Sequence, residues 1–319
     1  MKTASSKKIA VLAGGPSCER EVSLISGQAV LDALLTRGFE AFLMDPVEGF
    51  ASALRARGVD MAFVALHGTF GEDGTAQRLL EAEGVAYTGN GPAVSETAFD
   101  KSKAQPLFKQ AGILVPDFQI LARQDIFKAD SRLGYPLVVK PACAGSSVGI
   151  SIVRAERDFA KACEQAFLYS DRLLVERFIR GRELTVGVLG DQPLPVVEVL
   201  PGREFYDYEA KYKDTRTRYE CPARLGTAEA RLVVDTALAA YKTLGCQVMA
   251  RVDVILDGDG RPYVLEANSI PGLTGKSLLP KAAKAQGIDF PDLCVKILEL
   301  SASLSLERNR DRGRAWSHA

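Results

Sequence analysis

The stretch RVDVILDGDGRPYVLEANSIPGLTG, residues 251–275, decides the fold of this chain. Two runs of alternating apolar and polar residues flank Asp259-Gly260, a dipeptide typical of a two-residue β-hairpin turn. A turn there places four polar side chains on one face, with Arg251 opposite Asn268 and Asp253 opposite Glu266. The other face is apolar throughout only if the register bends around Val252, Val254, Val264 and Leu265.

The four polar side chains predict a metal site. Facing carboxylates at Asp253 and Glu266 repel each other unless a proton or a cation lies between them. Two carboxylates and the carbonyl oxygen of Asn268 suit Mg²⁺, which completes its shell with water and substrate phosphates. A solvent-facing polar stripe would explain the two acids alone. The asparagine two residues after Glu266 and the Pro-Gly loop that follows favour the metal site.

A second candidate site follows a strand that ends at Lys140. The loop 141–149 is rich in small residues, glycine and serine among them, so its backbone N–H groups can approach a phosphate while Lys140 supplies positive charge. It is not the GxxxxGK[ST] phosphate loop, because the lysine precedes the glycines. A surface loop without a ligand explains the same composition equally well.

The first 100 residues alternate strands and helices, which predicts a parallel sheet with helices on both faces. Ligands bind such sheets beyond the carboxyl ends of the strands, where two polar loops lie, 14–19 and 67–74. Glu19 and Glu21 would repel a pyrophosphate, so a cationic amine is the better guest, although Glu21 also suits the helix dipole. His67 is open to a structural or a functional interpretation.

Two further segments follow, and we expect three domains, 1–100, 101–180 and 181–319. Pro106 must lie in the first turn of its helix, since it would break the helix elsewhere. The stretch 205–213 is aromatic and charged and could form an ordered loop over a site. The basic stretch 308–319 is expected to be a frayed tail.

Composition excludes several classes of protein. The chain has 319 residues, with 40 Lys plus Arg against 40 Asp plus Glu, so no nucleic-acid partner is expected. No apolar run approaches the roughly 20 residues that span a bilayer, so no membrane partner is expected either. The six cysteines lack CxxC pairing and predict reduced thiols in a cytoplasmic protein.

The same residues resemble the D-alanine–D-alanine ligases of the ATP-grasp superfamily. The resemblance covers about residues 7–300 and rests on GGPSCEREVS (14–23), ALHGTFGEDGT (65–75), Asp100-Lys101, VVKPACAGSSVG (138–149), FYDYEAKY (205–212), RVDV (251–254) and LEANSIPGLTGKSLLP (265–280). It implies an α/β fold, an ATP-grasp with an N-terminal parallel-sheet domain and two α+β domains gripping ATP.

The resemblance also implies the site residues. ATP would contact Lys101, Lys140, Glu176, Phe178, Ile179, Glu183 and Lys211. Two Mg²⁺ ions, for which Mn²⁺ can substitute, would be held by Asp253, Glu266 and Asn268. The first D-alanine would meet Glu19 and His67, and Glu19 would hydrogen-bond with Ser146 and Tyr212. Arg251 and the Gly272 backbone would stabilise the oxyanion, and the second D-alanine's carboxylate would lie at Ser277 and Leu278.

The implied reaction joins two D-alanines through an acyl phosphate, giving D-alanyl-D-alanine, ADP and phosphate for peptidoglycan precursor synthesis. A ligase with D-lactate or D-serine as second substrate is the alternative. The family also implies a homodimer. A nucleotide-binding regulator without catalysis is disfavoured because every expected metal and phosphate ligand is present. An NAD-dependent oxidoreductase is disfavoured because the GxGxxG fingerprint is missing.

Overall fold

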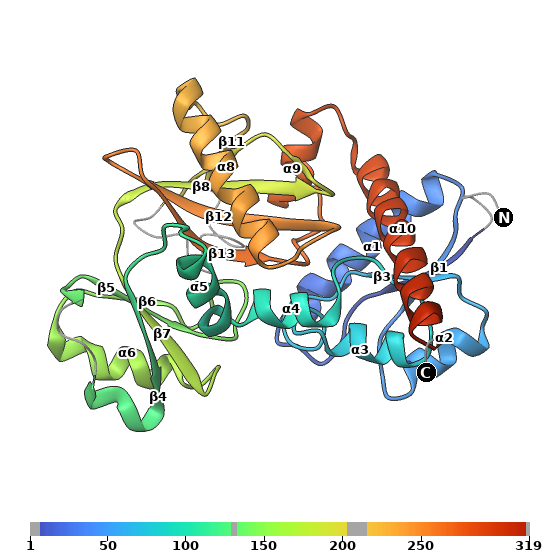
Figure 1. Ribbon diagram of the computed structural model, residues 1–319, viewed down its shortest axis with the longest axis horizontal. Coiled ribbons are helices and arrows are strands. Elements are labelled where there is room, and N and C mark those ends of the chain that lie inside the picture. Colours follow the sequence, from blue (N-terminus) through green and yellow to red (C-terminus); the bar gives the residue numbers. More distant parts are fainter. Residues whose placement is uncertain (1–6, 129–132, 203–215, 317–319) are drawn as a thin grey trace.

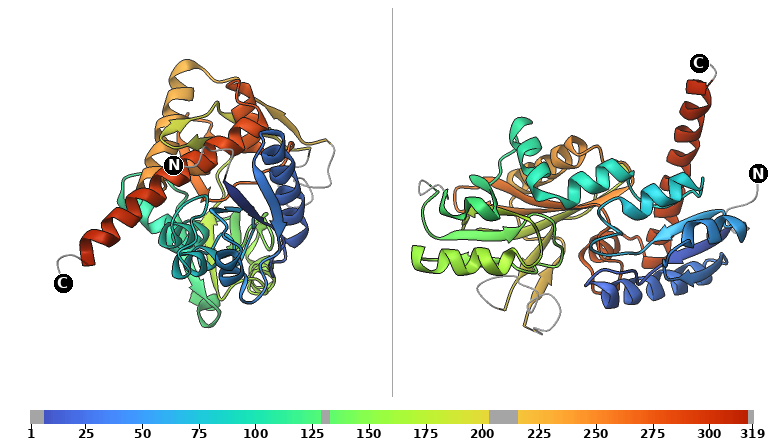
Figure 2. Two further views of the ribbon diagram at one scale, coloured as in Figure 1. Left: turned by 90° about the vertical axis from the view of Figure 1, so that its right-hand side faces the viewer. Right: turned by 90° about the horizontal axis from the view of Figure 1, so that it is seen from below.

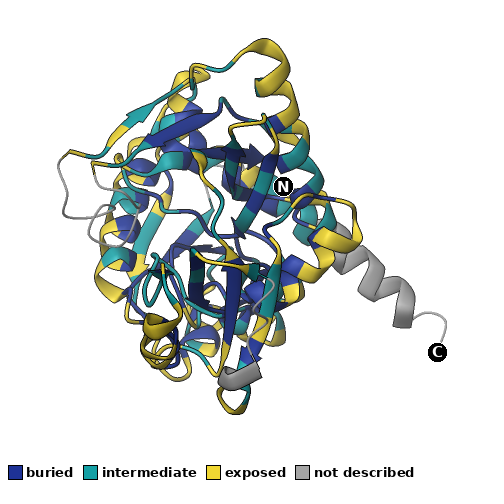
Figure 3. Ribbon diagram, turned by 90° about the vertical axis from the view of Figure 1, so that its left-hand side faces the viewer, coloured by how far each residue is buried: buried dark blue, intermediate teal, exposed yellow. Residues whose placement is uncertain are grey.

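The chain folds into three sheets that follow one another along the sequence (Figure 1). The computed structural model describes residues 7–128, 133–202 and 216–316, with side chains over 7–125, 133–202 and 216–305. Buried residues fill the central strands, and exposed residues lie on outer helix faces and loops (Figure 3). The α/β expectation is confirmed, with one sheet in each expected domain, while the boundaries at 100 and 180 stay predictions.

The N-terminal sheet is parallel, as the alternation of strands and helices predicts. Its central strand pairs with the second strand on one side and the third on the other, and the loops after the first and third strands carry Glu19 and His67. Helices α2 and α4, of seven and eight residues, are too short for apolar periodicity to predict them. The elements are β1 Lys8–Leu12, α1 Arg20–Thr36, β2 Glu40–Met44, α2 Phe50–Ala56, β3 Met61–Val64, α3 Thr75–Ala82 and α4 Pro92–Phe99.

The central sheet is antiparallel, in the order β4-β7-β5-β6. Its α-helix, α6, is directly preceded by a short 3-10 turn. The elements of this part of the chain are α5 Lys101–Gln110, β4 Phe118–Ala122, η2 Arg123–Lys128, β5 Leu137–Pro141, β6 Ser151–Val153, η4 Glu156–Asp158, α6 Phe159–Ala166 and β7 Arg172–Arg177.

Helix α5 continues through Pro106, so the expectation that this proline lies in the first turn is wrong. Proline in a helix interior costs about 3 kcal/mol or more. One local and one tertiary feature offset that cost. The Asp100 carboxylate caps the helix by accepting from the Ser102 N–H at 3.0 Å, and Phe108 is fully buried.

The third sheet is antiparallel as well, in the order β11-β10-β8-β12-β13 with β9 paired to β8. Helix α8 packs its buried face, which includes Val233 and Ala237, against apolar side chains of β8 and β12. The elements are β8 Gly181–Leu189, β9 Gln192–Pro193, β10 Val197–Leu200, β11 Arg218–Glu220, α8 Thr227–Thr243, β12 Met249–Asp257 and β13 Pro262–Asn268.

The β12–β13 hairpin confirms the predicted pairs, Arg251 with Asn268 and Asp253 with Glu266. The predicted two-residue turn is wrong, because the N–H of residue 257 donates to the carbonyl of residue 261 and leaves a three-residue loop, 258–260. The register then shifts by one between residues 253 and 254, with Leu265 as the extra residue of a β-bulge. The extra loop residue and the bulge cancel, which is why the predicted pairing holds.

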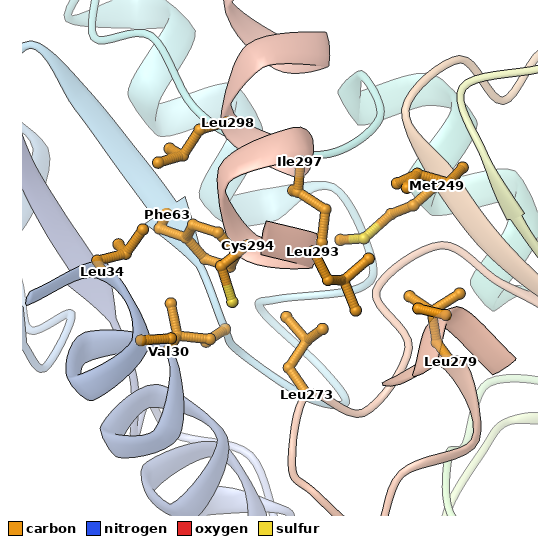
Figure 4. Close-up of a cluster of buried hydrophobic side chains, with 14 of the residues drawn as sticks. Val30, Leu34, Phe63, Met249, Leu273, Leu279, Leu293, Cys294, Ile297 and Leu298 are labelled. Atoms are coloured by element: carbon orange, nitrogen blue, oxygen red, sulfur yellow. The ribbon is translucent and has the colours of Figure 1, made fainter. Parts of the chain in front are cut away.

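The C-terminal helices return to the N-terminal sheet. A buried cluster joins Val30 and Leu34 of α1 and Phe63 of β3 to Leu293 and Ile297 (Figure 4). The two helices are α9 Leu278–Ala285 and α10 Phe290–Trp316, and α10 is continuous (Figure 2). The frayed tail expected from residue 308 is therefore wrong as far as Trp316. No helix of the described ranges has the length and apolarity needed to cross a bilayer.

Candidate active site

A cavity of about 1000 Å³ is lined by residues of the central and third sheets, and by helix α1 and two loops of the N-terminal unit. Fifteen of the predicted site residues line it: Glu19, His67, Lys140, Ser146, Glu176, Phe178, Ile179, Glu183, Arg251, Asp253, Glu266, Asn268, Gly272, Ser277 and Leu278. Lys101 reaches its wall by contacting Glu266. The whole aromatic stretch 205–213, with Lys211 and Tyr212, lies outside the described residues.

Asp253 accepts contacts from three neighbouring side chains. Arg251 donates to it through Nε and Nη2, both at 2.8 Å, in a bidentate pair. Thr185, its partner on β8, donates to Oδ1 at 2.7 Å. Asn268 Nδ2 lies 3.3 Å from Asp253 Oδ2 and 3.5 Å from Glu266 Oε1, so the three predicted metal ligands meet. Sequence reasoning missed Thr185, since the pairing of β8 with β12 leaves no local signal.

Glu266 is paired with a buried lysine. Lys101 Nζ lies 3.0 Å from Glu266 Oε2 and donates to the Ala144 carbonyl at 2.9 Å. Burial is the largest single influence and lowers the pKa of Lys101, but Glu266 together with the nearby Cys143 and Glu72 outweighs it, so this pKa is raised. Lys101 therefore keeps its positive charge beside the hairpin and the small-residue loop.

The central sheet contributes a second buried ion pair. Lys140 Nζ of β5 lies 2.8 Å from Glu176 Oε2 of β7, with both side chains almost fully buried. Burial raises the pKa of Glu176 even though Lys140 opposes the shift. Glu176 Oε1 has no hydrogen-bond partner within the part of the chain that is described. This end of the cavity therefore offers a ligand the ammonium group of Lys140 and the Oε1 atom of Glu176 as a hydrogen-bond acceptor.

The loop 141–149 closes onto the N-terminal unit. Ser146 Oγ donates to Glu19 Oε1, as the resemblance implies, and Ser146 and Ser147 both have positive φ. A Cβ at Gly145 would lie 2.4 Å from Glu19 Oε2, so a larger residue there would have to displace the Glu19 carboxylate. Burial raises the pKa of the Cys143 thiol to about 11, which keeps it protonated at neutral pH.

His67 is held by two side chains that sequence reasoning did not identify. Its Nε2 lies 2.8 Å from Ser26 Oγ and its Nδ1 lies 3.5 Å from Glu72 Oε1. Burial raises the pKa of Glu72, while the contact with His67 opposes the shift and the nearby Glu19 adds to it. Two features of the sequence could have identified them. Ser26 lies on the buried side of α1, and Glu72 follows His67 by five residues in the polar loop 67–74.

The N-terminus of α9 opens into the same cavity. Ser277 is its N-cap residue, and Ser277 Oγ accepts from the Thr274 N–H at 3.1 Å. A Cβ at Gly272 would lie 2.8 Å from Ser277 Oγ, so the absence of a side chain lets the two loop positions approach. Free N–H groups and the dipole at a helix N-terminus favour a carboxylate ligand.

The donor set at the hairpin fits a divalent cation. No three His, Cys, Asp or Glu side chains of the described ranges group as a metal site. The protein therefore offers two carboxylates and the Asn268 amide, whose oxygen would have to turn toward the ion. Substrate oxygens and water would supply the other ligands, as Mg²⁺ prefers. In this structure the negative charges of Asp253 and Glu266 are paired with Arg251 and Lys101.

Two antiparallel sheets that line one cavity with buried lysine–carboxylate pairs define an ATP-grasp protein. Two family models, described as D-ala D-ala ligase N-terminus and C-terminus, match residues 44–90 and 107–299. The chain belongs to the D-alanine–D-alanine ligase family.

Known relatives agree over nearly the whole length. The D-alanine–D-alanine ligase of Anaeromyxobacter dehalogenans is 45% identical over 305 residues, covering 95% of this chain and 99% of that protein. A Bacillus anthracis D-alanine–D-alanine ligase complexed with ATP has a TM-score of 0.84 at 35% identity, covering 95% and 99% of the two chains. The VanG D-Ala:D-Ser ligase of Enterococcus faecalis has a TM-score of 0.79 at 30% identity, covering 93% and 99%.

Proposed function

We propose that this chain is an ATP-dependent ligase that joins two D-alanines into D-alanyl-D-alanine for peptidoglycan precursor synthesis. One observation carries the proposal: three kinds of group meet in one cavity. Buried lysines suit a triphosphate, the hairpin cluster suits its divalent cation, and Glu19 suits a substrate ammonium. No single sheet supplies all three.

The nucleotide end is the wall formed by β5, β7 and the start of β8. Lys140 and Lys101 would contact the phosphates, and the unpaired Glu176 Oε1 would accept a hydrogen bond from an adenine amine. The adenosine pocket would be completed by Phe178, Ile179 and Glu183. Lys211 is proposed for the phosphates, and Tyr212 for the contact with Glu19, on resemblance alone.

The first step transfers a phosphoryl group. A carboxylate oxygen of the first D-alanine, held by Glu19 beside His67, attacks the γ-phosphorus, and ADP leaves. Two anions approach each other only where cations reduce their repulsion. Lys101 and Lys140 supply two such charges, and Mg²⁺ ions held by Asp253, Glu266 and Asn268 would supply the remainder.

The second step forms the peptide bond. The free amine of the second D-alanine, with its carboxylate at Ser277 and Leu278, attacks the acyl carbon. Phosphate leaves with the bonding electron pair, and the nitrogen releases one proton as the amide forms. Arg251, held by its bidentate contact with Asp253, and the Gly272 N–H would stabilise the tetrahedral oxyanion. Removing one such donor typically costs about 10²–10³ in rate.

The test is phosphate release and dipeptide formation from D-alanine, ATP and Mg²⁺. We expect both products with the native chain and neither with Glu266→Ala, whose hairpin lacks one proposed ligand. Unchanged dipeptide formation by Glu266→Ala would refute the proposed roles. Replacing the second substrate by D-serine or D-lactate separates the alternative ligases, because each alternative would form its own mixed product with D-alanine.

Two further proposals rest on the family resemblance. The protein acts in the cytoplasm, and it forms a homodimer. Sedimentation velocity at several protein concentrations tests the dimer, because a monomer at all of them contradicts it.

A further inference from the structure

The β-bulge at Leu265 decides where the Glu266 carboxylate points. Val264 and Ala267 are buried in the core, at 0% and 3% exposure, whereas Leu265 and Glu266 both line the cavity. Strict alternation would place two consecutive residues on opposite faces. Without the bulge, either Leu265 or Glu266 would therefore turn into the core. The register shift opposite Asp253 is what aims Glu266 at the metal cluster.

The side chain of Gln105 holds this bulge. A bulge leaves its extra residue outside the regular ladder. Gln105 Nε2 donates to the Leu265 carbonyl at 2.6 Å and lies 3.5 Å from the Val264 carbonyl. Gln105 is fully buried, and its Oε1 has no hydrogen-bond partner among the residues described. An apolar side chain would fill this space without burying an unpaired oxygen, so the donor half of the amide is the useful part.

Helix α5 holds the same point through a second residue. Lys101 lies four residues before Gln105 and so faces the same side of the helix. Lys101 contacts the Glu266 carboxylate at 3.0 Å, while Gln105 bonds the backbone of the preceding residue. The start of α5 is itself anchored, because Asp100 accepts from Arg172 Nη2 of β7 at 2.7 Å. The helix thus ties the hairpin to the central sheet.

We propose that Gln105 is a positioning residue for the divalent-cation site: by holding the Leu265 carbonyl, it keeps the Glu266 carboxylate turned toward Asp253 and Asn268. The inference rests on the proposed function, because it takes Glu266 as a ligand. Gln105 does not line the cavity, so it acts on the cation through Glu266. Removing a residue that orients a metal ligand typically weakens metal affinity or activity about 10- to 100-fold.

The test compares Gln105→Met with a control on the same helix, Phe108→Leu. Gln105→Met keeps the volume but loses the donor. Phe108→Leu loosens the buried face of α5, in the same core cluster as Val264, but removes no hydrogen bond to the bulge. Mn²⁺ is titrated into each protein saturated with ADP, and free Mn²⁺ is followed by electron paramagnetic resonance. Melting temperatures and the KM for D-alanine are measured alongside. If Gln105→Met does not fold, Gln105→Asn, which shortens the reach of the amide, replaces it.

We expect Gln105→Met to weaken Mn²⁺ binding about 10-fold or more, with the KM for D-alanine changed less than about 2-fold. Phe108→Leu should lower the melting temperature and leave Mn²⁺ binding within about 2-fold of the native value. Equal Mn²⁺ affinity in Gln105→Met and native protein, or equal losses in both variants, overturns the inference. The proposed function fails separately, if the native protein makes no dipeptide.

Discussion

Replacing Lys140 by methionine should destabilise the protein strongly at alkaline pH and weakly at acid pH. Lys140 Nζ and Glu176 Oε2 are 2.8 Å apart, and their side chains are only 6% and 3% exposed. Removing one partner of a buried ion pair typically costs about 3–5 kcal/mol, because the other charge stays buried without compensation. Lys101 also lowers the pKa of Glu176, so we expect the lower end, about 3 kcal/mol.

The pH dependence follows from Glu176. Burial already raises its folded pKa above the value of about 4.3 in unfolded chains, and the loss of Lys140 raises it further. A group with a raised folded pKa stabilises the protein below its unfolded pKa, and that contribution is lost as pH rises through the folded pKa. The deficit of Lys140→Met should therefore be small near pH 5 and full at pH 8.

Urea unfolding of four proteins at both pH values measures this effect. They are the native chain, Lys140→Met, Glu176→Gln and the double variant, which form a double-mutant cycle. The double variant buries no charge at this position, so it should recover part of the loss seen in Lys140→Met at pH 8. A loss below about 1 kcal/mol at pH 8, or a loss equal at both pH values, would show that the pair is not electrostatically coupled as described.

Three further changes test other parts of the cavity. Arg251→Met should lower kcat for phosphate release about 10²–10³-fold, because it removes an oxyanion donor. Gly145→Ala should raise the KM for D-alanine by up to about 100-fold, because its Cβ would displace Glu19. Burial raises the pKa of Glu72, so Glu72→Gln, which cannot ionise, should gain stability relative to the native chain between pH 5 and pH 8 in thermal unfolding.

Each of these three predictions can be contradicted by its own measurement. The roles differ from those described if Arg251→Met retains full kcat, or if the stability difference of Glu72→Gln is the same at both pH values. Gly258→Ala is the control for Gly145→Ala, because a Cβ at Gly258 meets no atom within 4 Å. Equal KM values for the two glycine variants would contradict the contact with Glu19.

The pairing of Asp253 with Glu266 was predictable from the sequence, but the loop length and the bulge that produce it were not. Alternating residues around a glycine turn imply which side chains share a face. The prediction placed Asp253 opposite Glu266 with a turn one residue too short, and the bulge at Leu265 supplied the missing residue. The apolar residues indicated that the register must shift somewhere in the hairpin, but not that the shift lies at Leu265.

Two predictions that rested on local preferences were wrong. Pro106 lies inside α5, since the capping by Asp100 and the buried Phe108 stabilise a helix that its own sequence disfavours. The basic tail is helical to Trp316, although its composition suggested fraying. Local propensities are worth about 1 kcal/mol or less per ordinary residue, so packing can override them.

The sequence by itself determined the N-terminal parallel sheet, the facing acids of the hairpin, and the small-residue loop after Lys140, because turn chemistry and side-chain alternation act over a few residues. Only the tertiary structure decided that Glu72 and Ser26 hold His67 and that Gln105 holds the bulge. The bond from Gln105 to Leu265 spans 160 residues, and the one from Ser26 to His67 spans 41. Such contacts form only when the packing of whole sheets brings their partners together, and no local pattern records that packing.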